Sequence, residues 1–154
     1  MHNFEQVKDV LDHGRQLHAD LRGFYESLNE REQQARVHLL LDYLSRHERH
    51  LEETVARFEG ESRRQVLDTW MQYAPSIDVN KLINVKSLAA HGDMSVDEVV
   101  RLAIEFDDAM VELYREAADE ADISRVKDVF RNLVELESHE KLKMVRDTLM
   151  FGDM

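Results

Sequence analysis

Apolar residues recur at alternating spacings of three and four residues along most of the chain. Such spacing places them on one side of an α-helix. Gly60 ends the second of these stretches, as glycine commonly does after a helix, and Ser95 with Glu98 forms a capping-box signal at the start of the third. The pattern predicts long helices at residues 3–29, 31–59, 95–121 and 123–150.

The segment from residue 61 to 94 has a weaker and mixed pattern. A short helical stretch, SRRQVLDTWMQYA, is broken by Pro75, and turn-forming residues follow it. We interpret the segment as a long crossover that joins two helical hairpins and caps one end of the bundle. The sequence therefore predicts an all-α fold, a four-helix bundle with a crossover, in a single domain over residues 1–154.

Composition narrows the range of partners. The chain has 154 residues, of which 43% are hydrophobic and 34% are charged, as expected for one globular domain with its own core. A net charge of −12 disfavours binding to nucleic acid or to anionic membrane surfaces. Without cysteine, the chain cannot form thiolate metal sites. It shows neither a signal peptide nor an apolar run of about 18 residues. We expect a cytoplasmic protein.

Ionisable side chains interrupt the apolar stripes of the predicted helices. A buried ionisable group is strongly unfavourable unless it is paired or bound to a metal. Two pairs of these residues lie three positions apart, so the members of each pair share a helix face, with Cβ atoms about 5–6 Å apart. The candidate metal ligands are His18, His47, His50, Asp107, Glu137 and Glu140.

The two halves of the chain repeat these polar positions. Four polar residues of the first half each have a polar counterpart 89 or 90 residues later. The matched residues are His18 and Asp107, Tyr25 and Tyr114, His47 and Glu137, and His50 and Glu140. Nearly constant offsets indicate a pseudo-symmetric bundle with a polar cluster at mid-height.

Four segments carry a resemblance to a known family. AIEFDDAMVELY (103–114) and FRNLVELESHE (130–140) resemble the ferritin-like superfamily and, within it, rubrerythrin-like proteins; LHADLRGFY (17–25) and LDYLSRHERHL (41–51) do so more faintly. The resemblance covers both predicted hairpins but not the crossover. It implies two irons, held by one Glu from each of two helices and by Glu-x-x-His from each of the other two.

The chain departs from that ligand set. Glu137 and His50 keep the residue types that the resemblance implies, whereas the other positions exchange one possible ligand for another. The exchanged residues are His18, His47, Asp107 and Glu140. With three carboxylates and three imidazoles, two divalent ions would leave uncompensated positive charge in a core of low dielectric constant. One ion is therefore easier to hold.

The resulting prediction is an asymmetric site for one transition-metal ion. Imidazole and carboxylate ligands suit zinc, ferrous iron, nickel or copper rather than magnesium or calcium, and we expect iron or zinc. The predicted ligands of this ion are His18, His47, His50 and Glu137. Asp107 and Glu140 would form a weak or empty second position.

Three classes of function stay open at this point. The first is a non-haem metal oxidoreductase or an iron- or oxidant-handling protein, although without cysteine it cannot carry the rubredoxin-like centre of full rubrerythrins. The second is a metal-binding or sensing module without turnover. The third is a structural bundle whose polar cluster is a metal-free relic held by ion pairs. We favour a metal-binding bundle without an assigned reaction, and we expect a homo-oligomer, most simply a dimer.

Overall fold

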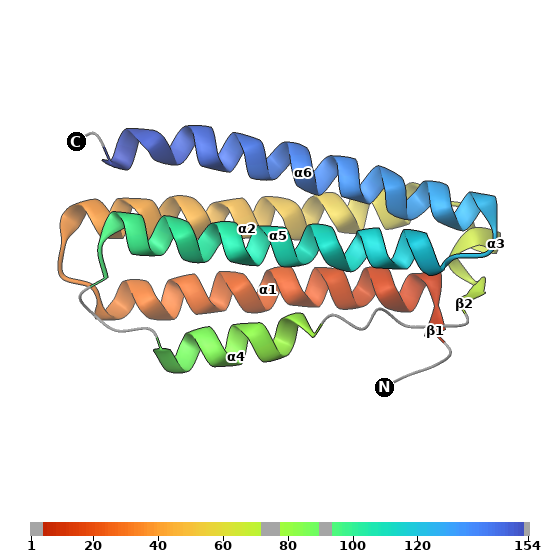
Figure 1. Cartoon of the computed structure of the whole chain (residues 1–154), viewed down its shortest axis with the longest axis horizontal. Coiled ribbons are helices and arrows are strands. Elements are labelled where there is room, and N and C mark those ends of the chain that lie inside the picture. The colour runs from red at the N-terminus through yellow and green to blue at the C-terminus, as the bar shows by residue number, and fades with distance from the viewer. Residues whose placement is uncertain (1–4, 72–77, 90–93, 153–154) are drawn as a thin grey trace.

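The computed structural model describes residues 5–71, 78–89 and 94–152. Its long helices are α1 (Val7–Arg31), α2 (Ala35–Glu61), α5 (Val96–Glu120) and α6 (Ser124–Gly152). Figure 1 shows them side by side with their long axes nearly aligned. Helix α1 packs most extensively against α2, and α5 against α6, so the bundle consists of two hairpins. The predicted all-α four-helix bundle is confirmed.

Two helix starts differ from the prediction. Glu5–Gln6 form a short strand, β1, which pairs antiparallel with β2 (Trp70–Met71). The Gln6 N–H donates to Asp9 Oδ2 at 3.0 Å, a capping interaction that begins α1 at Val7 rather than at residue 3. At its other end α1 continues to Arg31, so α2 begins at Ala35 rather than at residue 31. The remaining helix ends lie within two residues of the prediction.

The crossover covers a side of the bundle as well as one end. Helix α3 (Arg64–Leu67) and strand β2 lie at the end where α1 begins, as expected for a cap. Helix α4 (Val79–Ala89) instead packs along α1 and α5, with Val79 and Ile83 buried (Figure 1). The crossover thus caps one end, as expected, and it also runs along the bundle, because α4 has apolar residues that need a longitudinal surface to cover them. Pro75 lies outside the described residues.

The core contains a group of aromatic rings beside the polar level of the bundle. Phe24 and Phe106 meet edge to face at 5.5 Å between ring centroids, and Tyr25 makes similar contacts with each of them. Such edge-to-face pairs add to the stabilisation that burial of the rings supplies. Among the described residues, no helix combines the length and the low polarity that crossing a lipid bilayer requires.

Gly14 makes room for a buried tyrosine. A Cβ atom at this position would overlap the Tyr114 hydroxyl oxygen and lie 3.0 Å from Tyr114 Cζ. We therefore expect Gly14→Ala to lower the free energy of unfolding by about 1–2 kcal/mol, because a clash worth about 1–3 kcal/mol outweighs the gain of about 1 kcal/mol in helix propensity. Denaturant unfolding measures this change.

Two further variants separate the clash from other effects. Gly23 lies on the same helix, and a Cβ atom added there would have no neighbouring atom within 4 Å. Gly23→Ala should therefore stabilise the protein by about 0.5–1 kcal/mol. In a Tyr114→Phe background, which removes the hydroxyl group, Gly14→Ala should lose most of its penalty. Additive effects of the two substitutions would show that the Tyr114 hydroxyl group is not the source of the penalty.

Candidate metal centre

Four of the predicted ligands lie buried near the middle of the four long helices. His18 on α1 is fully buried, Glu137 on α6 and Asp107 on α5 are 2% and 3% exposed, and His47 on α2 is 8% exposed. A fifth ionisable residue, Glu48 on α2, is fully buried beside them. Each charge here has lost its hydration, so its partners decide whether the cluster is stable.

His18 joins two carboxylates. Its Nδ1 lies 2.7 Å from Glu48 Oε1, and its Nε2 lies 2.7 Å from Glu137 Oε1. A neutral imidazole has only one N–H, so engaging both carboxylates requires a further proton, either on the second ring nitrogen or on one carboxyl group. Glu48, His18 and Glu137 therefore form a hydrogen-bonded row, and this row has a net charge of −1 wherever the proton resides.

His47 and Asp107 form a second pair, in which His47 Nε2 lies 3.1 Å from Asp107 Oδ2. This pair is the pseudo-symmetric counterpart of His18 and Glu137, because His18 matches Asp107 and Glu137 matches His47 in the internal repeat. The repeat thus relates two imidazole–carboxylate pairs, and each pair joins a histidine of the first half to a carboxylate of the second half. Glu48 has no such match, since position 138 is Ser138, so only the pair of His18 and Glu137 is extended to a row of three.

Glu48 is the buried group that the sequence reasoning missed. The stripe predicted for this helix passes through His47 and does not include its neighbour Glu48. A second stripe with steps of four and three also follows α2, and its members are Val37, Leu41, Leu44, Glu48, Leu51 and Val55, all buried. The buried face of α2 is wide enough to include both stripes, as is usual for a core-facing helix. That second stripe was the signal for Glu48.

His50 and Glu140 lie apart from the buried set. His50 Nε2 is 3.4 Å from Glu140 Oε1, and their side chains are 51% and 16% exposed. His50 therefore contacts Glu140 at the surface. The structure does not bring it together with His18 and His47, although the sequence predicts these three histidines as ligands of one ion. Its position three residues after His47 moves it around the helix, toward the outer side of the contact between α2 and α6.

The surroundings shift the proton affinities of the buried groups. Burial alone would lower the pKa of His18, but Glu137 and Glu48 outweigh it and raise that pKa well above its ordinary value. Burial alone would also lower the pKa of His47, but the hydrogen bond and the charge of Asp107 outweigh it and raise that pKa. Burial raises the pKa of Glu48 and Asp107, while His18 and His47 act against that rise. Without a metal, the cluster therefore holds its protons firmly.

Two tyrosines lie at matched positions of the repeat, and both are fully buried. Burial raises the pKa of Tyr25 well above its ordinary value, helped by Glu48 and Asp107, and burial with Glu137 does the same for Tyr114. Both phenols therefore keep their protons. Neither hydroxyl oxygen has a hydrogen-bond partner within the described part of the chain.

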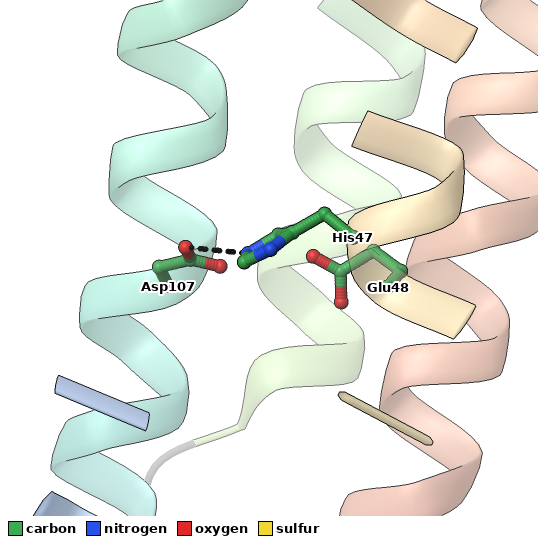
Figure 2. Close-up of side chains that lie close together, drawn as sticks. All are labelled: His47, Glu48 and Asp107. Carbon is green, nitrogen blue, oxygen red and sulfur yellow. Dashed lines mark hydrogen bonds and ion pairs between the residues drawn. The ribbon is translucent and has the colours of Figure 1, made fainter. Parts of the chain in front are cut away.

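His47, Glu48 and Asp107 meet a geometric condition for holding an ion. Each offers a ligand atom, and these atoms all lie within 4.8 Å of one another. Figure 2 shows His47 and Glu48 extending from neighbouring positions of α2 toward Asp107 on α5. Two ligands at about 2.1 Å from one ion are at most about 4.2 Å apart, so shifts of a few tenths of an ångström at each side chain would close the site.

The unsatisfied oxygens of this group support the same conclusion. Glu48 Oε2 and Asp107 Oδ1 are buried without a hydrogen-bond partner among the described residues. Leaving a buried carboxylate oxygen unpaired is costly, and a cation bound by these two carboxylates would remove that cost. One imidazole and two carboxylates form a donor set that suits ferrous iron or zinc. The residues present therefore fit a metal ion.

The comparisons with known proteins concern the fold. A solved structure from Thermotoga maritima, provisionally described as a ferritin-like diiron-carboxylate protein, matches this structure with a TM-score of 0.60. The match covers 96% of this chain and 97% of the other at 19% sequence identity. No family model matches the sequence, and no curated protein matches it. The four-helix arrangement and this likeness together show that the chain has the ferritin-like fold predicted from its sequence.

Proposed function

We propose that the protein binds one divalent transition-metal ion inside the bundle, with His47, Glu48 and Asp107 as ligands. The observation that carries the proposal is the convergence of three ligand atoms within 4.8 Å, two of them from carboxylates that each leave a buried oxygen unpaired. Exposed carboxylates often cluster without a metal, but these three residues are buried, where an uncompensated charge is unfavourable.

Charge balance favours a single ion. The row of Glu48, His18 and Glu137 has a net charge of −1, and Asp107 beside a neutral His47 adds another −1. One divalent ion neutralises this total, whereas two would leave excess positive charge even if His18 lost its extra proton. In a water-free interior such an excess is costly. The extra proton of the row therefore supplies positive charge that takes the place of a second metal ion.

In this proposal, His18 orients a ligand rather than binding the metal. Its bond to Glu48 Oε1 leaves Oε2 of the same carboxylate free for the ion. Hydrogen bonds of this kind fix the direction of a ligand and tune its basicity. His47 can bind the ion only in its neutral form, so protons compete with the metal for His47, and the metal affinity should fall as the pH is lowered.

Iron and zinc are the preferred ions, and the description of the Thermotoga maritima neighbour as a diiron-carboxylate protein favours iron. Either ion would act as a Lewis acid when bound, and iron would in addition exchange an electron. The chain supplies a buried, charge-balanced donor set, and it adds two protonated tyrosines at the same level. The proposed function is accordingly metal binding, without a specified turnover reaction.

A metal-free structural bundle is the second candidate. It is favoured by the existing partners of His18 and His47, which already satisfy most of the cluster through carboxylate contacts. In that case the polar residues would only fix the register of the two hairpins. The two candidates differ in whether the unpaired oxygens of Glu48 and Asp107 take up an ion.

Metal analysis of protein purified without a histidine tag distinguishes the two candidates. We expect one iron or zinc ion per chain after anaerobic loading and desalting, and a higher unfolding temperature in the loaded protein than after chelator treatment. Less than about 0.1 ion per chain, with no change in unfolding temperature, would establish the metal-free bundle. Two ions per chain would contradict the charge-balance argument.

A further inference from the structure

We propose that His50 and Glu140 form a separate capture site, which takes up the metal ion at the surface and delivers it to the buried centre. This inference rests on the proposed metal-binding function. It concerns two residues that share helix faces with the buried groups but lie outside their cluster. The pair would bind the ion transiently and would not be part of the loaded centre.

The location of the pair places it between solvent and the centre. His50 is 51% exposed at its side chain, and it follows His47 by three residues on α2; Glu140 follows Glu137 by three residues on α6. His47 is the most exposed member of the proposed ligand set, at 5% of its side chain against 3% for Asp107 and 0% for Glu48. Of the three proposed ligands, the one with the most exposed side chain is therefore also the one that lies one helical turn from His50.

The internal repeat gives the pair a special position. His50 and Glu140 are counterparts of each other, so the pseudo-two-fold operation maps their contact onto itself. The same operation exchanges the pair of His18 and Glu137 with the pair of Asp107 and His47. A contact that maps onto itself must cross the pseudo-axis, and a path inward along that axis reaches the space between the two buried pairs.

The geometry of the pair suits a cation better than it suits a hydrogen bond. His50 Nε2 and Glu140 Oε1 are 3.4 Å apart, beyond the usual range of about 2.7–3.2 Å for an N–H···O bond. Two atoms at that separation can both lie about 2.1 Å from one ion, at an angle of roughly 108°, which is close to tetrahedral. An ion could therefore enter without repacking, and little existing interaction would be lost.

The opposite side of His47 is closed. The Tyr43 hydroxyl donates to Asp147 Oδ2 at 2.9 Å, which ties α2 to α6 one turn from His47 on the side away from His50. The Tyr43 ring lies parallel to His47, with 6.4 Å between centroids and 7° between planes, and it also contacts Phe151. These contacts fill the junction of α2 with α6 on the side of His47 away from His50, so we place the entry of the ion on the side that carries His50 and Glu140.

Stopped-flow mixing of metal-free protein with Co²⁺ tests the capture site, because Co²⁺ absorbance reports binding directly. We expect His50→Ala/Glu140→Gln to lower the association rate by at least about tenfold, the lower end of the effect of charged guiding sites. Dissociation into excess chelator should slow by the same factor. Removing a site that the ion occupies only transiently, during entry and exit, changes both rates by the same factor and leaves Kd unchanged.

Matched variants exclude a general effect of surface charge. His139→Ala/Glu135→Gln makes the same substitutions at two exposed positions of α6, and its rates should equal those of the unmodified protein. An unchanged association rate in His50→Ala/Glu140→Gln would overturn the capture site. A weaker Kd with an unchanged or faster dissociation rate would also overturn it, because the two residues would then be ligands of the loaded centre.

The outcome also separates this inference from the proposed function. If the unmodified protein binds one Co²⁺ and the double variant binds it at the same rate, only the capture site is lost. If the unmodified protein shows no Co²⁺ absorbance and no saturable binding, both proposals are overturned. His50→Ala alone, measured beside the double variant, should give an intermediate association rate, since Glu140 would still attract the cation.

Discussion

Replacing His18 with leucine should lower the free energy of unfolding of the metal-free protein by about 3–5 kcal/mol, as is typical when one partner of a buried ion pair is removed. His18 engages Glu48 and Glu137 through its two ring nitrogens, and all three side chains are at most 2% exposed. Leucine has a similar size but provides neither hydrogen bonds nor charge. The two carboxylates would then lie in the core without compensation. Denaturant unfolding in the presence of a chelator measures the loss.

A rescue variant tests the electrostatic explanation. His18→Leu combined with Glu48→Gln and Glu137→Gln removes both charges, so it should recover at least about half of the lost stability. His139→Leu, at an exposed position, controls for the chemical change and should shift stability by less than about 0.5 kcal/mol. If His18→Leu costs less than about 1 kcal/mol, the carboxylates are neutral or hydrated, and the charge balance that favours one ion fails.

Replacing Asp107 with asparagine should weaken metal binding by at least about a hundredfold, since changes to residues that merely support a ligand already cost about 10–100-fold. The substitution keeps the size of the side chain and one carbonyl oxygen. It removes one of the two net negative charges that balance the ion, and it leaves an amide nitrogen in place of the second oxygen. Competition against a fluorescent chelator gives the affinity.

Asp108→Asn is the matched control, because it makes the same change at the next position. Its side chain is 53% exposed and forms an ion pair with Lys141, outside the buried centre. We expect the affinity of this variant to stay within about twofold of that of the unmodified protein. Equal affinities for Asp107→Asn and the unmodified protein would place the ion elsewhere, and Asp107 would have to be dropped from the ligand set.

Much of the fold and the level of the site could be predicted from periodicity. A helix has 3.6 residues per turn, so the stripe of apolar residues identified each inward face and the ionisable residues on it. The offsets of 89 and 90 residues then placed His18, His47, Asp107 and Glu137 at one height. That placement agrees with the structure because both hairpins are long and regular, and small errors in helix ends do not change which residues face inward.

The partners within the site could not be predicted in this way. Spacing along one helix does not determine which side chain of another helix it meets, because that depends on the rotation of each helix about its axis and on the rotamer of each side chain. A modest rotation of α2 brings Glu48 into the core with His47 and turns His50 toward the surface. With this rotation, His18 meets Glu48 and Glu137 instead of the two histidines that the sequence predicts beside it.

The amino-acid sequence by itself determined the four helices, the pseudo-symmetric arrangement of their polar residues and the acidic, cysteine-free character of the chain. These features depend on local spacing and composition. Only the tertiary structure decided which imidazole faces which carboxylate, which oxygens lack a partner, and which residues meet solvent. In a buried cluster the net charge and the number of ions follow from those contacts, because removal of water makes each pairing energetically decisive.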